Sequence, residues 1–270
     1  MAILSMSPGP MWQKQSMKIE LKPHERLDDL VLDGMKIIQR DDQFCFSLDT
    51  VLLAHFGPVP HGPALDLGTG TAAIPLILTS RGAADITGVE LNPVMADIAR
   101  RNAGINGREE CIHIIEEDYR RIRSWSASGA YAAVYVNPPY REKARGAVSE
   151  AEGIRRARHE ETATLTDVME AARYALKYHG RFRMIHIADR LTDVLAAMRC
   201  YGLEPKAVQM IHGRAHKKAK LFLVEGIRGG NPGMSIEPPV IVHDEDGSYS
   251  HAVLAMYGKA VCLGTGKEGM

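Results

Sequence analysis

The stretch that decides the fold is ALDLGTGTAAI, residues 64–74. The apolar run ALDL indicates a buried strand, and the glycines of GTGTA indicate a turn into a helix. Gly68 and Gly70 let backbone N–H groups approach a ligand closely, and the helix N-terminus adds partial positive charge. This unit is typical of an α/β sheet whose ligands bind at the carboxyl ends of its strands.

Strands and helices alternate downstream of this unit. The predicted strands are 64–67, 86–91, 111–115, 131–136 and 181–187, and the predicted helices are 73–82, 92–107, 164–180 and 191–202. Two further strands, 205–213 and 219–229, are joined by a turn too short for a crossover helix, so they should pair antiparallel. The pattern predicts a doubly wound, seven-stranded α/β sheet with an antiparallel hairpin at its end.

The flanking segments predict smaller elements. Residues 26–41 place Asp33-Gly34 between apolar runs, which predicts a hairpin, and residues 47–56 predict a helix. Residues 238–258 predict one strand, a turn and a short helix. We therefore expect a flexible tail (1–25), an N-terminal hairpin and helix (26–60), a main domain (61–230), and a C-terminal add-on and tail (231–270).

Composition limits the class of protein. Of the 270 residues, 45% are hydrophobic, and 33 basic residues balance 33 acidic ones, so any nucleic-acid surface must be local. No apolar run approaches the ~20 residues that span a bilayer, and the first residues lack the pattern of a secretion signal. We therefore expect a cytoplasmic protein without membrane contact. The four cysteines form no C-x-x-C pair, so we expect no metal site.

Acidic residues lie at or after the ends of three successive predicted strands. Asp66 lies inside the end of the first strand, Glu90 ends the second, and Asp118 follows the third. A carboxylate at Asp66 would repel a pyrophosphate but suits an ammonium or a sulfonium group. Glu90 can hold ribose hydroxyls, and Asp118 can accept a hydrogen bond from an adenine amine. The arrangement favours S-adenosylmethionine over NAD, because S-adenosylmethionine has these groups and no phosphate.

The fourth predicted strand ends in the corner Asn137-Pro138-Pro139-Tyr140. Asn137 Oδ1 and the Pro138 carbonyl can accept both N–H groups of a planar amine or a carboxamide, which holds the nitrogen toward a methyl donor. The prolines make the corner rigid, and Tyr140 can stack on a flat substrate. We expect these four residues to be catalytic, without a general base before the transfer.

The motifs DLGTGTA, GVEL, EEDY and NPPY together resemble those of amino-group methyltransferases of the Rossmann-like class I. More narrowly, the segments RDDQFCFSLDTVLLAHF, RHE and AKLFLVEGIRGG are similar to those of the bacterial tRNA1(Val) adenine-N6 methyltransferases. The resemblance covers about residues 40–225. It implies S-adenosylmethionine-dependent methylation of the adenosine just 3′ of the anticodon in valine tRNA. It also implies that the segment around Ser47 and Asp49 closes over the methionine end of the cofactor.

Two local clusters of basic residues are candidates for contact with tRNA phosphates. The cluster after the corner includes Arg155, Arg156 and Arg158, and the cluster in the segment PKAVQMIHGRAHKKAK includes Lys217, Lys218 and Lys220. Both clusters are expected near the carboxyl edge or the far end of the sheet, where they can hold the RNA backbone. The alternative is a pair of solvated basic faces.

The corner selects amine geometry rather than the identity of a ring, so other substrates stay open. A release-factor glutamine fits it, although only about 40 residues precede the first site and leave no room for a separate N-terminal helical domain. A guanine N2 amine of ribosomal RNA fits as well. A DNA adenine methyltransferase usually needs a target-reading domain, for which the chain has no spare ~100 residues. The intact corner argues against a non-catalytic binding module.

Overall fold

The computed structural model describes residues 19–30, 32, 34–43, 45–139 and 164–258. Its helices and strands follow the alternating order that the sequence predicts. They are β1 (Glu25–Asp29), β2 (Lys36–Arg40), α1 (Leu48–His55), β3 (Ala64–Leu67), α2 (Ala73–Ser80), β4 (Ile86–Glu90), α3 (Pro93–Ile105), β5 (Ile112–Glu116), the 3-10 helix η1 (Tyr119–Ser124), β6 (Tyr131–Val136), α5 (Leu165–Ala175), β7 (Leu176–Ile187), the 3-10 helix η2 (Ala188–Arg190), α6 (Leu191–Cys200), β8 (Leu203–His212), β9 (Ala219–Arg228), β10 (Ser235–Ile241) and α7 (His251–Met256).

The main sheet has eight strands in the order β10-β8-β9-β7-β6-β3-β4-β5. The strands from β7 to β5 are parallel, and β9 lies antiparallel between β7 and β8. The seven predicted strands and their antiparallel hairpin are therefore confirmed. The strand expected in the C-terminal segment is β10, which pairs parallel with β8 and adds an eighth strand at the edge.

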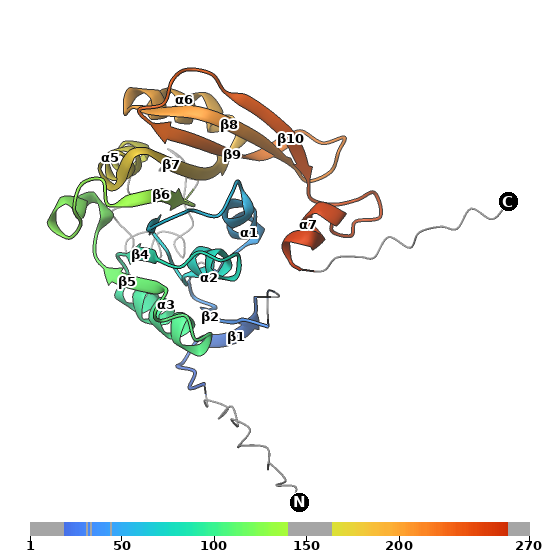
Figure 1. Ribbon diagram of the computed structural model, residues 1–270. Helices are drawn as coiled ribbons and strands as arrows, with labels where there is room; N and C mark the ends of the chain where they lie inside the picture. Colours follow the sequence, from blue (N-terminus) through green and yellow to red (C-terminus); the bar gives the residue numbers. More distant parts are fainter. Residues whose placement is uncertain (1–18, 31, 33, 44, 140–163, 259–270) are drawn as a thin grey trace, which may run out of the picture.

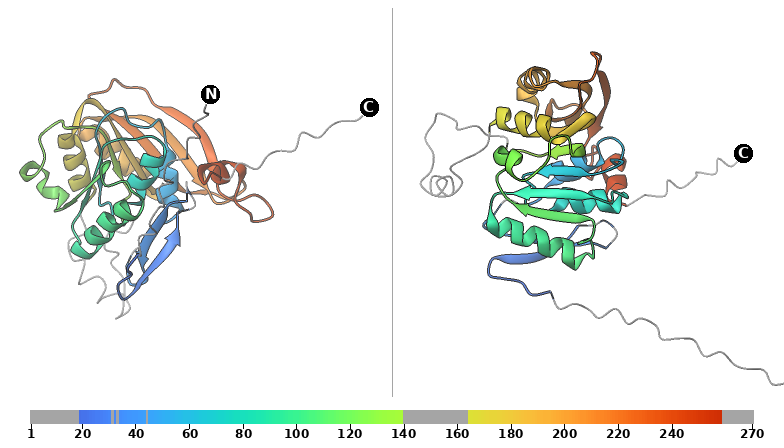
Figure 2. Two further views of the ribbon diagram at one scale, coloured as in Figure 1. Left: turned by 60° about the horizontal axis from the view of Figure 1, so that its bottom comes forward. Right: turned by 60° about the vertical axis from the view of Figure 1, so that its left-hand side comes forward.

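Helices cover both faces of the sheet. One face packs against α1, α2 and α7, and its core includes Val51, Leu76, Tyr135 and Val253. The other face packs against η1, α5 and α6, and its core includes Val168 and other fully buried side chains. Figure 1 shows β8, β9 and β10 at one end of the molecule and the β1–β2 hairpin beside α3 at the other, and both views of Figure 2 agree. The layers are those of a doubly wound α/β fold.

The N-terminal hairpin is bonded to α3 through two asparagines. Asn102 is fully buried; its Oδ1 accepts from the Ile38 N–H (2.6 Å), and its Nδ2 donates to the Ile38 carbonyl (3.1 Å). Asn106, one turn later, bonds both backbone groups of Lys36 in the same way (2.9 and 2.7 Å). Asn102 Nδ2 also donates to the carbonyl of Thr71 (2.9 Å), which lies in the GTGTA turn. The predicted hairpin is confirmed, and α3 ties it to that turn.

One predicted boundary is wrong. The helix expected over 164–180 begins with a capping box at Thr164 but ends at Ala175, and residues 176–180 belong to β7. Leu176 is extended and fully buried, and it pairs with Tyr131 of β6. Gly180 does not end a helix; a Cβ there would lie 2.9 Å from the Lys177 carbonyl, at an irregularity in the β6–β7 pairing. Burial against β6 overrides the helical pattern of this segment.

The C-terminal segment has the expected strand, turn and short helix, with α7 packed against the face that carries α1. The division of the chain into four parts remains a prediction. In the part of the chain that the structure describes, no helix is both long and apolar enough to cross a membrane.

Candidate active site

Three neighbouring strands end at one level on the carboxyl edge of the sheet. Leu67 of β3 pairs with Val136 of β6 on one side and with Val89 of β4 on the other. The next residue of each strand therefore follows in the same row, which places Gly68 beside Asn137 and Glu90. Neighbouring strands are about 4.8 Å apart, so this register brings the predicted cofactor loop and the predicted catalytic corner together.

The GTGTA turn holds its backbone in a shape that only glycine adopts easily. Gly68 and Gly70 have φ angles of 72° and 56°, and a Cβ added to either would meet no atom within 4 Å among the described residues. The Gly68 N–H donates to the Val89 carbonyl (2.9 Å), and the Gly70 N–H donates to Glu90 Oε2 (2.9 Å). Hydrogen bonds to β4 therefore hold the turn on one side, and the space beside both glycines is open, as a ligand-binding loop requires.

Asp66 is a buried carboxylate that lacks a second partner. Its side chain is almost fully buried, Oδ2 accepts from the Thr69 hydroxyl (2.7 Å), and Oδ1 has no partner among the residues described. Burial raises the pKa of Asp66 to about 7; the Thr69 hydrogen bond opposes this shift and the charge of Glu90 adds to it. An ammonium group at Oδ1 would satisfy the orphaned oxygen and favour the charged form. The free acceptor atom of this buried carboxylate therefore fits the ammonium group at the amino-acid end of S-adenosylmethionine.

Gly88 makes room for this arrangement. It pairs with Asp66 across β3 and β4, and a Cβ on it would lie 2.8 Å from Thr69 Oγ1. The Thr69–Asp66 hydrogen bond therefore depends on glycine at this position.

Glu90 connects the turn to the next helix. One carboxylate oxygen accepts from Gly70, and the other accepts from the Asn92 N–H (2.9 Å). Asn92 in turn caps α3 by accepting from Val94 (3.0 Å), as the sequence predicts. Each carboxylate oxygen keeps a second lone pair, so these contacts leave Glu90 able to accept from a ribose hydroxyl.

Asp118 lies two residues beyond β5 on the same edge. Its carboxylate caps η1 by accepting from the Arg120 N–H (2.8 Å), and it also pairs with the Arg120 guanidinium (2.6 Å). Burial alone would raise the pKa of Asp118, but hydrogen bonds from the Arg120 side chain and backbone hold it below its usual value. The structure thus gives Asp118 a local role, and its contact with an adenine amine stays a prediction.

The catalytic corner begins where β6 ends. Asn137 is half-buried, and its Nδ2 donates to the hydroxyl of Thr50 in α1 over 3.5 Å. Pro138 is half-buried and Pro139 exposed, while Tyr140 lies outside the described residues. The contact with Thr50 places the first turn of α1 next to the corner.

This first turn carries the two residues expected to close over the cofactor. Ser47 is the N-cap of α1, and its Oγ is buried without a hydrogen-bond partner among the residues that the structure describes. Asp49 lies in the same turn. Both therefore lie on the element that contacts Asn137, and their contact with a cofactor stays a prediction.

Lys217 and Lys218 lie in the β8–β9 turn, and Lys220 lies at the start of β9. Leu221 of β9 pairs with Ile187 at the end of β7, so the turn lies on the same edge as the corner. Lys217, Lys218 and Lys220 are exposed, and none pairs with an acidic side chain in the described part of the chain. The other predicted cluster, Arg155, Arg156 and Arg158, lies outside the described residues.

Two surface hollows of about 380 Å³ each lie elsewhere, one between α6 and β8 and one between Ile19 and α3, and no predicted site residue lines either. Over the described ranges, no three His, Cys, Asp or Glu side chains gather as metal ligands.

Sequence reasoning missed two residues of the site. Thr69 lies within GTGTA, where the sequence indicates only a turn, yet its hydroxyl donates to Asp66. Thr50 lies 87 residues from Asn137, and no local pattern indicates their contact.

Known proteins are similar to this chain over most of its length. The family described as Conserved hypothetical protein 95 matches residues 50–160. The chain is 30% identical over 200 residues to the tRNA1(Val) (adenine(37)-N6)-methyltransferase of Porphyromonas gingivalis, covering 72% of this chain and 77% of the relative. The protein of the same name from Aeromonas hydrophila is 29% identical, with 75% and 84% covered.

Solved structures share the fold at low sequence identity. A predicted O-methyltransferase from Agrobacterium tumefaciens superposes with a TM-score of 0.63 at 19% identity, covering 79% of this chain and 96% of that one. TYW2 from Pyrococcus horikoshii, solved with MeSAdo, superposes with a TM-score of 0.54 at 12% identity, covering 77% and 73%. The fold is that of class I methyltransferases, and by its sequence the chain belongs to the tRNA1(Val) (adenine(37)-N6)-methyltransferase family.

Proposed function

We propose that this protein transfers the methyl group of S-adenosylmethionine to the N6 amine of adenosine 37 in tRNA1(Val). The observation that carries the proposal is the register of β3 and β6, which sets Asn137 beside Gly68 and near Asp66, whose buried Oδ1 has no partner among the described residues. The names of the relatives supply the nucleotide and the tRNA. The reaction belongs in the cytoplasm, where this substrate is found.

Residues at the ends of three strands, together with the first turn of α1, would hold the cofactor. Asp66 Oδ1 would accept from its ammonium group, the open backbone at Gly68 and Gly70 would face its amino-acid portion, and Glu90 would accept from its ribose. Asp118 is proposed for the adenine amine, and Ser47 with Asp49 would close over the methionine end. When bound, S-adenosylmethionine supplies an electrophilic methyl group on a sulfonium.

The corner would activate the amine by holding it. The lone pair of an adenine amine is delocalised into the ring, so the nitrogen is a weak nucleophile in its planar form. Asn137 Oδ1 and the Pro138 carbonyl would accept its two N–H groups and favour the positive charge that grows on nitrogen. The prolines keep both acceptors in place, and Tyr140 would stack on the base. The surplus proton leaves the nitrogen after the methyl group has arrived, so no base is needed earlier.

The basic clusters would hold the RNA backbone. Lys217, Lys218 and Lys220 lie on the edge where the flipped adenosine must enter, and they are exposed without acidic partners in the described chain. Arg155, Arg156 and Arg158 follow the corner in sequence and are proposed for the same role.

The test is methyl transfer from labelled S-adenosylmethionine to undermodified bacterial tRNA, followed by digestion to nucleosides. Label in N6-methyladenosine, lost in an Asn137→Ala variant that still binds S-adenosylmethionine, supports the proposal. A release factor and ribosomal RNA are assayed in parallel. Label in N5-methylglutamine or N2-methylguanosine instead would overturn the choice of substrate. It would leave the assignment of the active-site residues unchanged.

A further inference from the structure

We propose that Asn102 is a positioning residue for the cofactor, because it holds the GTGTA turn in the shape that binds S-adenosylmethionine. The inference rests on the proposed function, since it concerns the same cofactor site. It extends that site to α3 and, through α3, to the N-terminal hairpin.

Backbone groups alone fix the orientation of the Asn102 amide. Oδ1 accepts from the Ile38 N–H (2.6 Å), and Nδ2 donates to the carbonyls of Ile38 (3.1 Å) and Thr71 (2.9 Å). A backbone N–H only donates and a carbonyl only accepts, so the reversed amide would place donor against donor and acceptor against acceptor. Asn102 is fully buried, so bulk water does not compete for these bonds.

The Thr71 carbonyl needs a partner from outside its own helix. Ala72 is the N-cap of α2, and its carbonyl accepts from the Leu76 N–H (3.0 Å). Thr71 lies one residue earlier, so its carbonyl is outside the helical pattern. Thr71 is 4% exposed, and a buried carbonyl without a donor destabilises the conformation that contains it. Asn102 supplies this donor.

The same bond opposes strain at the next residue. Ala72 has a φ angle of 62°, in the left-handed region that a residue with a Cβ rarely adopts. Rotating the peptide group between Thr71 and Ala72 by half a turn would take Ala72 out of this region. Asn102 holds the carbonyl of that peptide group, and the Thr69 carbonyl accepts from its N–H (2.9 Å). Strained backbone persists where its surroundings fix it, as these two bonds do.

A rotated peptide group would disturb the side of the turn that faces the ligand. The bond from the Ala72 N–H to the Thr69 carbonyl closes the turn, and the Thr69 hydroxyl donates to Asp66 Oδ2 (2.7 Å). Without the first bond Thr69 is free to move, and with it Asp66, whose Oδ1 is the proposed partner of the ammonium group. Asn102 therefore acts on the cofactor through the turn and not by contact.

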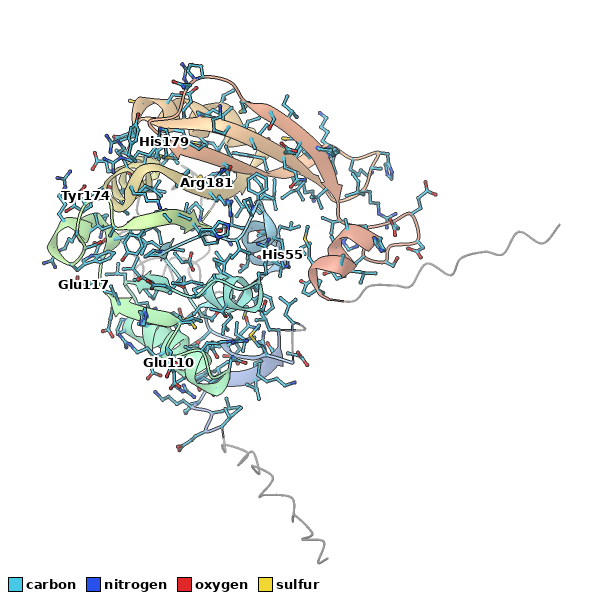
Figure 3. The ribbon with its side chains drawn as sticks, in the orientation of Figure 1. His55, Glu110, Glu117, Tyr174, His179 and Arg181 are labelled. Carbon is cyan, nitrogen blue, oxygen red and sulfur yellow. The ribbon has the colours of Figure 1, made fainter. Side chains whose placement is uncertain are left out.

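The hairpin fixes Asn102 from the other side. Its amide bonds both backbone groups of Ile38 in β2, and Figure 3 labels Glu110 in the loop that follows this end of α3. β2 also reaches the start of α1, because the side chain of Gln39 accepts from the Phe46 N–H (2.8 Å). The hairpin thus supports both the turn and the segment expected to close over the cofactor.

The chain offers a matched control in Asn106. Its amide bonds both backbone groups of Lys36 in β2 (2.9 and 2.7 Å), but among the described residues it makes no hydrogen bond to the turn. Asn106→Ala therefore weakens the hairpin and leaves the partner of Thr71 in place. We expect the Kd for S-adenosylmethionine, measured by calorimetry, to rise about 10-fold in Asn102→Ala and to stay within about twofold in Asn106→Ala.

A double-mutant cycle separates positioning from a general loss of stability. In the Ala72→Gly background the left-handed conformation is no longer strained, so the turn keeps its shape without the bond from Asn102. Relative to Ala72→Gly alone, adding Asn102→Ala should raise the Kd by less than about threefold, while still lowering the unfolding temperature. A role in folding alone would leave the Kd of the folded protein unchanged in both backgrounds.

A measurement on the wild-type protein needs no variant, so it decides the matter even if Asn102→Ala does not fold. Coupling between cofactor binding and the turn is reciprocal. Saturating S-adenosylmethionine should therefore slow hydrogen exchange at the Asn102 side-chain amide about 10-fold, and change exchange at the Asn106 side-chain amide by less than about twofold.

Three results would overturn the inference: a Kd within about twofold of wild type in Asn102→Ala, the same rise in Asn106→Ala, or an unchanged exchange rate at Asn102 in the wild-type complex. If the wild type binds S-adenosylmethionine but methylates no tRNA, the proposed substrate fails, and the Kd comparison still decides the role of Asn102. If it binds none, the proposed function fails, and exchange at the Ala72 N–H decides instead. Faster exchange there in Asn102→Ala, relative to the amides of β6, would show that Asn102 holds the turn, and an unchanged rate would show that it does not.

Discussion

Replacing Asp66 by asparagine separates the stability of the fold from the binding of the cofactor. The buried carboxylate has a pKa of about 7 against an ordinary value of 3.8. Between these values the folded protein binds a proton that the unfolded chain has released. Stability from this group is therefore full below about pH 4, is lost as the pH rises to about 7, and stays level above that.

The size of the effect follows from the shift. A shift of roughly three pKa units corresponds to about 4 kcal/mol at most, of which roughly 2.5 kcal/mol is lost between pH 5 and pH 8. Asparagine has the same shape and does not titrate. Relative to wild type, ligand-free Asp66→Asn should therefore gain roughly 2.5 kcal/mol of unfolding free energy between pH 5 and pH 8.

The same substitution should weaken cofactor binding, although it stabilises the ligand-free fold. Losing a buried carboxylate partner for an ammonium weakens S-adenosylmethionine by about 10- to 100-fold at pH 8. In wild type, binding at pH 6 should release about one proton, measurable by calorimetry in two buffers of different ionisation enthalpy, and Asp66→Asn should release none. Urea denaturation across pH gives the stabilities. Parallel pH profiles of unfolding free energy for the two proteins would refute the burial argument.

Three further perturbations test the site. Asn137→Ala should lower kcat by about 10²-fold or more with cofactor affinity unchanged, in single-turnover methylation; a normal rate would remove Asn137 from the site. Gly88→Ala pushes Thr69 off Asp66 and should weaken S-adenosylmethionine several-fold, by calorimetry, while an unchanged Kd would contradict the 2.8 Å clash. Lys217→Glu with Lys218→Glu should weaken tRNA binding and lower its salt slope by about two, measured by filter binding. An unaltered slope would show that these two lysines do not contact the tRNA.

Much of the fold was predictable because its signals are local. Strand, glycine turn and helix recur along the chain, and caps such as Asn92 and Thr164 stand where short-range hydrogen bonding requires them. The row of strand ends follows from parallel pairing alone, which is why the cofactor loop and the corner could be placed together before any contact was known.

The remaining features depend on contacts between distant segments. Leu176 leaves the helix because β6 offers it a buried place, and the helical pattern of its own segment gives no warning. Asp118 shows the reverse case, since a local cap with Arg120 competes with the long-range role that its position suggested. Thr50 joins the corner only because the N-terminal hairpin carries α1 there.

The buried pair of Arg183 and Glu225 was also not predictable. Arg183 lies between the buried apolar residues Phe182 and Met184 in β7. A charged side chain is rarely buried, so the sequence gives no sign that Arg183 lies in the core. It is tolerated because its guanidinium also reaches Tyr135 Oη (2.6 Å) and the Pro58 carbonyl, which together replace water.

The antiparallel strand β9 has a consequence for how the protein is made. It follows β8 in the chain but lies between β8 and β7. On the ribosome, β3 to β7 emerge first, and β8 has no partner in the sheet until β9 arrives. A nascent chain that stops near residue 215 leaves β7 and β8 with open edges, which are templates for pairing with another chain. The joining of β8 to the sheet, and with it the covering of the open edge of β7, therefore waits for synthesis of residues 219–228.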